Sequence, residues 1–355
     1  MGRRLRQITK NAIYETVQGI VDRQFMFRPD HYSDIPTLST MSPKNALDPG
    51  NDLTPIPSTL NIIGAAIGRA LKEVPVNLYC FEVSVNHGHR EESVDDSCCI
   101  GPKNCKWAGT PMCGVENHPA RFSQRVNSVI AQQINKKYGR EGHLFAAPER
   151  VTECVDAAQA EEKLFYAMTN TVKDGLVNKV SDSPFFSTYD FWTKEKPLSF
   201  WYIDWDAYYK AGGERKKNHR PKDYLCWVEW EPKVLPNWAD SKIHKYSTFI
   251  RQNCRDIEAE QRSIRKQQGR SVMGIEALYK LDPRDRPKTP RKKTPQPLCH
   301  ASDPKDRREY QVGWREFSSD HRKASWDYRM GNYEREFPEG SYRPPLICVY
   351  SSSYL

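Results

Sequence analysis

The sequence has no long hydrophobic run. Its longest nearly uncharged apolar stretch, residues 60–67, is far shorter than the roughly 20 residues needed to span a bilayer, so no membrane-spanning helix is expected. Residues 1–10 are charged and no apolar segment follows them, so no secretory signal is expected either. We therefore expect a cytoplasmic protein whose ten cysteines are reduced thiols.

The sequence also lacks several recognisable motifs. It has no Gly-x-x-x-x-Gly-Lys-Ser/Thr loop, no helicase or primase motif and no internal repeat of useful length, which argues against a P-loop ATPase and a repeat architecture. It does contain 18 Tyr, 13 Phe and 9 Trp, too many large side chains for a wholly disordered chain. A length of 355 residues predicts about two domains.

Positive charge is concentrated in the second half of the chain. Residues 1–190 hold 21 Lys and Arg against 22 Asp and Glu, whereas residues 191–355 hold 33 against 23. The net charge of +9 therefore comes entirely from the second half. This asymmetry favours a module that binds a polyanion such as nucleic acid, and the alternative is an ordinary solvated surface.

The first half alternates between strand and helix patterns, with strands expected at 13–21 and 76–85. Apolar residues at helical spacing predict helices at 61–73, 120–138 and 158–172. Residues 31–59 and 91–118 have irregular patterns and are expected to be insertions. A β-α-β-β-α-β order with one further helix predicts an α+β fold of the ferredoxin-like type, with an antiparallel sheet covered on one face.

The second half differs in composition. Residues 191–283 are rich in aromatic and basic side chains and form a predicted accessory region with a helix at 249–268. Residues 284–304 are proline-rich and basic, which is typical of an extended linker, and 305–355 form a C-terminal segment. Most of the tryptophans in this half are expected to be core residues.

Two pairs of residues could carry chemistry. His87 and His89 lie two residues apart at the end of a predicted strand. Residues i and i+2 of a strand point to one face, so both imidazoles could approach one cation. Tyr166 and Asn170 lie four residues apart on one face of the helix at 158–172. From the spacing alone, the histidines could equally be unrelated and the tyrosine a packing residue at the rim of the core.

Four segments in order resemble one family. In chain order they are residues 21–28, Asn-His-Gly-His at 86–89, residues 137–145, and Tyr-x-x-x-Asn-Thr-Val-x-x-Gly-Leu-Val at 166–177. Together they resemble the REP-associated tyrosine transposases, the single-tyrosine branch of the HUH endonucleases. The resemblance covers about the first 190 residues and implies a ferredoxin-like HUH domain there.

The resemblance implies a DNA transposase, a site-specific endonuclease of single-stranded DNA. Tyr166 would attack the phosphorus and form a 5′-phosphotyrosine, with Mg²⁺ or Mn²⁺ held by His87, His89 and Asn170. The substrate would be hairpin-forming, REP-like single-stranded DNA, cleaved and rejoined during transposition and recombination. Such a protein would be nucleoid-associated and either a monomer or a homodimer.

The sequence departs from the family pattern in a few places. Gly88 stands between the histidines where the family has a bulky apolar residue, and Asn170-Thr171 replaces its Asn-Pro. The histidines, tyrosine and asparagine are all present, which favours retained catalysis. The alternatives are a domesticated, catalytically weak or silent DNA-binding or regulatory protein, and an HUH replication initiator.

Further residues are candidates for binding DNA or zinc. His143 could contact DNA or be a structural residue in a turn. Cys98, Cys99, Cys105, Cys113 and His118 could bind zinc, but they lack a Cys-x-x-Cys pair and could be free thiols in a loop. Besides His143, the predicted contacts with the phosphate backbone are Arg140, Lys173, Lys216, Lys217, Arg291, Lys292 and Lys293.

Overall fold

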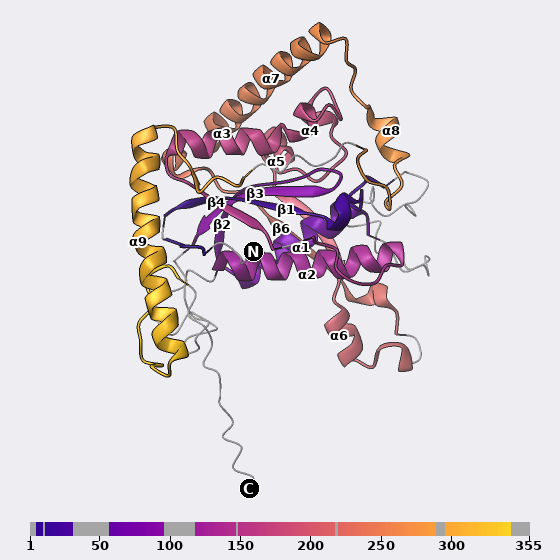
Figure 1. The fold of residues 1–355 in the computed structure, drawn as a ribbon. Coiled ribbons are helices and arrows are strands. Elements are labelled where there is room, and N and C mark those ends of the chain that lie inside the picture. Colours follow the sequence, from indigo (N-terminus) through magenta and orange to yellow (C-terminus); the bar gives the residue numbers. More distant parts are fainter. Residues whose placement is uncertain are drawn as a thin grey trace.

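The computed structural model contains a five-stranded sheet enclosed by helices (Figure 1). It describes residues 5–9, 11–30, 57–95, 118–146, 148–216, 219–288 and 295–341. The first elements follow the predicted β-α-β-β-α-β order with one further helix. They are β1 (Ile13–Gly19), α1 (Thr59–Glu73), β2 (Val76–Val83), β3 (His87–Val94), α2 (His118–Tyr138), β4 (Arg150–Cys154) and α3 (Ala157–Met168).

The strands lie in the order β2-β3-β1-β4-β7. The first four are antiparallel, and β7 (Cys299–His300) adds to β4 in parallel. Helices and a mostly antiparallel sheet make this an α+β fold, as the sequence predicts. The predicted helix at 158–172 is interrupted at Thr169, where α3 ends and the short α4 (Asn170–Lys173) begins.

Both faces of the sheet are covered, so the expectation of one covered face was wrong. Helices α1 and α2 lie on one face, and α3 lies on the other with α7 (Ile243–Gln267) beyond it (Figure 1). Each face has its own core, with Ile67 and Phe122 buried on the first and Leu164 and Trp192 on the second. The second core is completed by α5 (Tyr189–Lys194) and α7, which both follow α3 in the chain. It was not expected because no sequence pattern linked these two helices to this face of the sheet.

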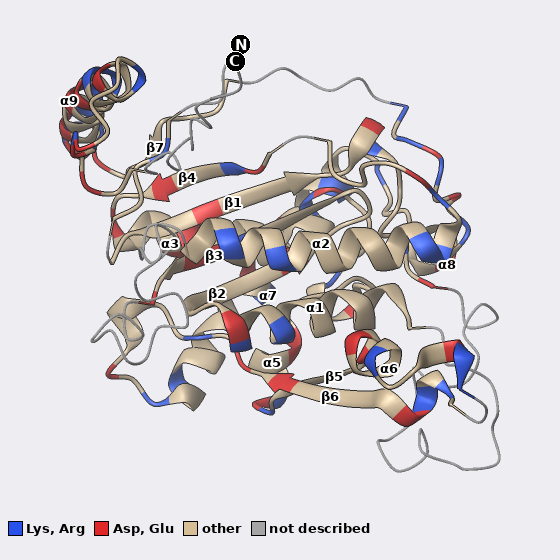
Figure 2. Ribbon diagram, turned by 90° about the horizontal axis from the view of Figure 1, so that it is seen from below, with Lys and Arg blue, Asp and Glu red and all other residues tan. Residues whose placement is uncertain are grey.

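Helix α1 is apolar around much of its circumference because it packs on two sides. Its outer side carries a two-stranded ribbon of β5 (Leu198–Ile203) and β6 (Leu225–Trp230), which lies beside α1 in Figure 2. Gly64 allows this approach, since a Cβ there would lie 2.3 Å from the Phe200 ring. Asn61 fixes the ribbon by pairing with the backbone of Trp201 through bonds of 2.7 and 3.1 Å.

The packing differs from the predicted division of the chain at residue 190. Phe200 and Trp230 belong to the same core as Ile67, and Tyr246 and Ile250 to the same core as Leu164. The predicted linker 284–304 contains β7, which joins the central sheet, so it is not wholly an extended linker. The other helices of this half are α6 (Trp205–Lys210), α8 (Ile275–Tyr279) and α9 (Pro304–Arg329). Short 3₁₀ helices lie at 213–215, 221–224 and 236–238 in this half, and at 21–23 and 180–182 in the first half.

The predicted insertion at 91–118 was wrong at both ends. Residues 91–94 continue β3, and His118 already begins α2, while 96–117 lie outside the described residues. The charged residues of β3 suggested a loop, but Arg90 is buried and makes a two-pronged contact with Glu149 at 2.9 and 3.0 Å. Of the insertion at 31–59, residues 31–56 also lie outside the described part, and Thr59 is already helical.

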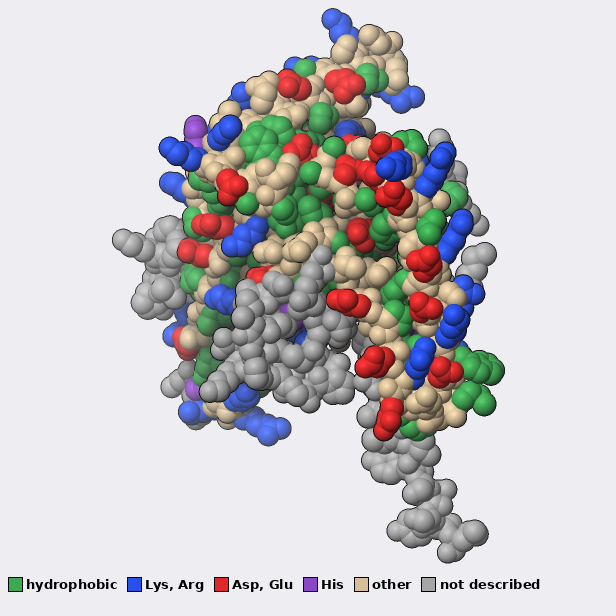
Figure 3. All heavy atoms as spheres, turned by 90° about the vertical axis from the view of Figure 1, so that its left-hand side faces the viewer, with side chains coloured by type: hydrophobic (Ala, Val, Ile, Leu, Met, Phe, Trp, Pro, Cys, Tyr) green, Lys and Arg blue, Asp and Glu red, His purple; other side chains and the backbone are tan. Residues whose placement is uncertain are grey.

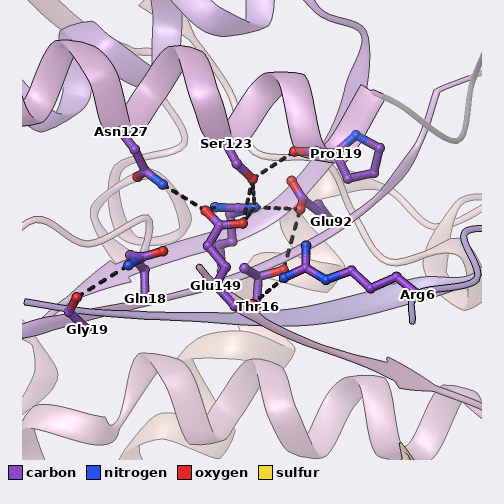
Figure 4. Close-up of polar contacts among 10 residues, drawn as sticks. Arg6, Thr16, Gln18, Gly19, Glu92, Pro119, Ser123, Asn127 and Glu149 are labelled. Atoms are coloured by element: carbon purple, nitrogen blue, oxygen red, sulfur yellow. Dashed lines mark hydrogen bonds and ion pairs between the residues drawn. The ribbon is translucent and has the colours of Figure 1, made fainter. Parts of the chain in front are cut away.

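Glu149, the residue directly before β4, links this part of the chain to α2 and β3. It accepts hydrogen bonds from Ser123 (2.6 Å) and Asn127 (2.9 Å) of α2 (Figure 4). Arg90 also donates a hydrogen bond to Glu92 at 2.9 Å. Every charged group in this cluster therefore has a charged or hydrogen-bonding partner, which is the condition for burying it. The cluster holds α2 against its face of the sheet.

On the face that carries α9, the charge of the C-terminal half does not form one basic surface (Figure 3). Figure 3 shows acidic and basic side chains interspersed there. Helix α7 begins at Ile243, six residues before the predicted range 249–268, and ends at Gln267, one residue short of it. Three of the six tryptophans between 192 and 238 are buried, namely Trp192, Trp201 and Trp230.

Among the described helices, none is both long and apolar enough to cross a membrane.

Candidate active site at the end of strand β3

Strand β3 places His87 and His89 on the face covered by α3. The alternation of side chains along β3 directs Arg90 toward α2 and the two histidines toward the opposite face. Their ring centroids are 5.0 Å apart. His89 is only 6% exposed, while His87, nearer the end of the strand, is half-buried.

Helix α3 brings Tyr166 to the same place. Asp156 caps the helix by accepting a hydrogen bond from the backbone N–H of Gln159 (2.8 Å), and Leu164 is buried beneath it. Tyr166 points away from that core and is 39% exposed. Its ring meets His89 edge to face, with centroids 5.6 Å apart. The tyrosine is thus both next to a histidine and open to solvent.

Asn170 completes the group from the first residue of α4. Its side-chain nitrogen lies 2.8 Å from Nε2 of His87, and Nδ1 of the same imidazole lies 2.8 Å from Oδ1 of Asn86. If Nδ1 carries the proton and donates to Asn86, the lone pair of Nε2 faces Asn170. The four residues of the sequence-predicted constellation therefore meet at one point of the structure.

Burial controls the protonation of these side chains. It lowers the pKa of His87 to about 3, and the neighbouring His89 and Arg23 side chains act in the same direction. Burial also lowers the pKa of His89, against an opposing effect of the Glu15 carboxylate. Both imidazoles are therefore neutral near pH 7, which is the form that binds metals. Burial, followed by Asp174 and Glu15, raises the pKa of Tyr166, so its phenol is protonated.

Two lysines flank the tyrosine ring. The Nζ of Lys173 lies 4.8 Å from the ring centroid of Tyr166, and that of Lys163 lies 5.8 Å from it. Lys173 is one of the residues predicted to contact DNA, whereas Lys163 was missed because nothing in its local pattern distinguishes it from a surface lysine. Together they place positive charge where a phosphate approaching Tyr166 would lie.

The side chains present fit a divalent cation. Nδ1 of His89 is buried and has no hydrogen-bond partner in the described chain, and Nε2 of His87 offers a second nitrogen. Rotating the Asn170 amide by 180° would present its oxygen in place of its nitrogen. No group of three or more His, Cys, Asp or Glu side chains within the described ranges is placed to hold a metal. Asn170 would therefore have to supply the third protein ligand.

Glu15 and His300 adjoin the site and were not anticipated. Glu15 of β1 has one oxygen 3.9 Å from Nδ1 of His89 and the other 2.8 Å from Nε2 of His300. His300 belongs to β7, in the region predicted to be a linker. The sequence offered no local signal for this contact, because it depends on the parallel pairing of β7 with β4.

Other predicted site residues lie elsewhere. Arg140 bonds to Asn135 (2.9 Å) and Gln24 (3.3 Å) just after α2, and His143 is exposed in the same turn. Lys216 is exposed after α6, and His118 is buried at the start of α2. The remaining candidates fall outside the described residues: Lys217, Arg291, Lys292, Lys293, Cys98, Cys99, Cys105 and Cys113.

Comparison with known proteins yields one distant similarity. No protein-family model matches the chain, and no curated protein matches it. A solved structure of a REP-associated tyrosine transposase bound to a REP hairpin resembles it with a TM-score of 0.32 and 16% sequence identity. The match covers 54% of this chain and 84% of the other. At that TM-score the match does not assign a family, and the function has to be argued from the site itself.

Proposed function

We propose that this chain cleaves and rejoins single-stranded DNA with Tyr166 as the nucleophile, acting on hairpin-forming repeats. One observation carries the proposal: a half-exposed tyrosine lies against His89, beside a second neutral histidine and an asparagine. A buried packing role would not require the tyrosine to be exposed or two lysines to flank its ring. The order β4-β1-β3-β2 within the sheet, which is that of a ferredoxin-like domain, supports the HUH assignment.

The reaction exchanges one phosphate ester for another. The Tyr166 oxygen would form a bond to phosphorus as the bond from phosphorus to the 3′-oxygen breaks, leaving a 5′-phosphotyrosine and a free 3′-hydroxyl. The phenol loses one proton and the departing oxygen gains one, so the step needs no net proton and no ATP. Attack by the 3′-hydroxyl of another strand end would reverse the exchange and join the DNA.

The chain's own residues would position the phosphate and the nucleophile. Lys163 and Lys173 would attract the phosphate to the exposed edge of Tyr166, and His89 would orient the ring. Asn86 would keep the proton of His87 on Nδ1. Mg²⁺ or Mn²⁺ bound by His87, His89 and Asn170 would supply neutralisation of the negative charge on the phosphate oxygens.

Formation of a covalent adduct tests the proposal. Single-stranded hairpin DNA labelled at each end in turn is incubated with the protein and Mg²⁺ or Mn²⁺, and adducts are separated on a denaturing gel. We expect an adduct that Tyr166→Phe abolishes and that the matched control Tyr333→Phe, at a 41% exposed tyrosine beyond the end of α9, leaves unchanged. An adduct of undiminished yield in Tyr166→Phe would exclude this nucleophile.

The metal ligands need a separate measurement. We expect His87→Ala to weaken Mn²⁺ binding in calorimetry and to abolish the adduct, while hairpin binding is retained. Mn²⁺ binding equal to that of the unaltered protein would remove His87 from the metal site. If the unaltered protein binds hairpin DNA but forms no adduct with either metal, it is a silent DNA-binding protein instead.

A further inference from the structure

A pocket lies on the other side of the sheet from Tyr166. It has a volume of about 290 Å³ and lies between α1, α2 and the segment that runs from β5 into α6. None of its lining residues belongs to the Tyr166 site. Helices α1 and α2 cover the sheet face opposite α3, and α6 lies beside them (Figures 1 and 2).

Aromatic side chains form one wall of this pocket. Trp201, Tyr202 and Trp205 line it, with Ile62 contributed from α1. Trp205 is held in place by ring contacts with Tyr208 (5.7 Å) and Tyr209 (6.0 Å, nearly parallel). The position of the wall is set in advance, because Asn61 ties the backbone of Trp201 to α1. A flat ligand could therefore stack here without first ordering the wall.

Two cations lie over these rings. The guanidinium of Arg69 is 4.5 Å from the Tyr202 centroid, and the Nζ of Lys136 is 4.5 Å from the Trp205 centroid. Neither forms an ion pair with a carboxylate of the part of the chain that the structure describes. The neighbouring Lys137, in contrast, is paired with Asp30. Within the described residues, the pocket thus combines aromatic faces with two positive charges that no carboxylate pairs.

We propose that this pocket holds one nucleotide of a single-stranded DNA. The base would stack on the wall of Tyr202 and Trp205 in place of the Arg69 and Lys136 side chains, which are long enough to turn from the ring faces to its phosphate. The side-chain amide of Gln133, which also lines the pocket, can donate to or accept from a base edge. This inference rests on the proposed function, and it extends the bound strand from the Tyr166 site to the opposite face of the molecule.

Binding of labelled single-stranded DNA to substituted proteins tests this pocket. Stacking on an aromatic side chain contributes 1–3 kcal/mol per base, so Trp205→Ala should weaken binding by roughly 5- to 150-fold. Lys136→Gln should lower the slope of log affinity against log salt by about 0.7, the value for one phosphate contact on a single strand. Affinity is measured by fluorescence anisotropy at several salt concentrations, with circular dichroism as the check on folding.

Two matched controls lie on α9. Trp326→Ala removes a 62% exposed tryptophan, and Lys323→Gln removes an exposed lysine. Both should bind DNA as the unaltered protein does. If Trp205→Ala does not fold, Trp205→Leu serves in its place, since it keeps apolar bulk but removes the stacking face. Affinities of the pocket variants equal to those of the controls would overturn the proposal, as would a failure of the unaltered protein to bind single-stranded DNA.

The outcome separates this inference from the proposed function. Weakened binding in Trp205→Ala together with an absent adduct in the unaltered protein would uphold the pocket and reject cleavage. A normal adduct together with unchanged binding in both pocket variants would do the opposite. In a last experiment, free deoxynucleotide at millimolar concentration competes with the labelled single-stranded DNA. If Trp205→Ala abolishes this competition, the base binds at this pocket. Tight binding of the free nucleotide without binding of the DNA would indicate a nucleotide ligand in place of a DNA strand.

Discussion

Glu82 is an ionisable side chain that the fold encloses between β2 and the segment before α5. It is 6% exposed, and its Oε1 accepts hydrogen bonds from the backbone N–H (3.0 Å) and the hydroxyl (2.6 Å) of Thr188. Burial raises its pKa to about 7, although the hydrogen bonds from Ser187 and Thr188 act in the opposite direction. The folded protein therefore binds a proton on Glu82 at pH values where the unfolded chain does not.

This difference in pKa predicts how stability changes with pH. The stabilisation associated with protonated Glu82 is fully present below about pH 4.5, the reference value, and is lost as the pH rises through about 7. A shift of about 2.5 pKa units corresponds to about 3 kcal/mol. Glu82→Gln keeps an oxygen that can accept both Thr188 hydrogen bonds but cannot ionise. We therefore expect it to be more stable than the unaltered protein at pH 8 and similar to it at pH 4.5.

Chemical denaturation at several pH values measures this effect. Unfolding in urea is followed by tryptophan fluorescence between pH 4.5 and 8 for the unaltered protein, Glu82→Gln and a control, Glu229→Gln, on the exposed side of β6. The difference in free energy of unfolding between Glu82→Gln and the unaltered protein should grow by about 3 kcal/mol over this range. A difference that stays constant with pH would refute the reasoning.

Two further substitutions test the sheet. Arg90→Met leaves the buried carboxylates of Glu92 and Glu149 without their cation, so we expect a loss of about 3–5 kcal/mol in the free energy of unfolding; a loss below about 1 kcal/mol would contradict this account of the cluster. Gly88→Ala adds a Cβ whose nearest neighbour, the Glu82 carbonyl oxygen, is 3.5 Å away, so thermal unfolding should show a gain of about 0.4–1 kcal/mol, and destabilisation would contradict the expected room.

The parts of the fold that follow from local periodicity could be predicted from the sequence. Apolar residues at 122, 126, 130 and 134 gave α2 its buried side, and the spacing of His87 and His89 in a strand gave both imidazoles one face. The four-residue spacing of Tyr166 and Asn170 brought Tyr166 to His89 and Asn170 to His87 even though the helix is interrupted at Thr169. These relations follow from spacings of two to four residues along the chain, so the chain need not be folded to infer them.

The parts that depend on distant pairing could not be predicted. Arg90, Glu91 and Glu92 are typical of a loop, and only Glu149 and α2 explain how Arg90 can be buried in a strand. The basic residues of the second half suggested a separate DNA-binding region, but its apolar residues complete both cores. The pocket at Trp205 joins Arg69 and Lys136 from the first half to a wall from the second, so neither half alone indicates it.

The pairing of β7 with β4 also sets when the sheet can be completed during translation. Strand β4 ends at Cys154, and its outer edge must wait for Cys299–His300. At about 5–20 residues per second, the ribosome needs on the order of ten seconds to make the intervening chain. During that time β4 presents an open edge, the kind of surface to which other strands add. A nascent chain would therefore expose this end of the β4 edge until Cys299 and His300 pair with Glu153 and Cys154 and His300 reaches Glu15.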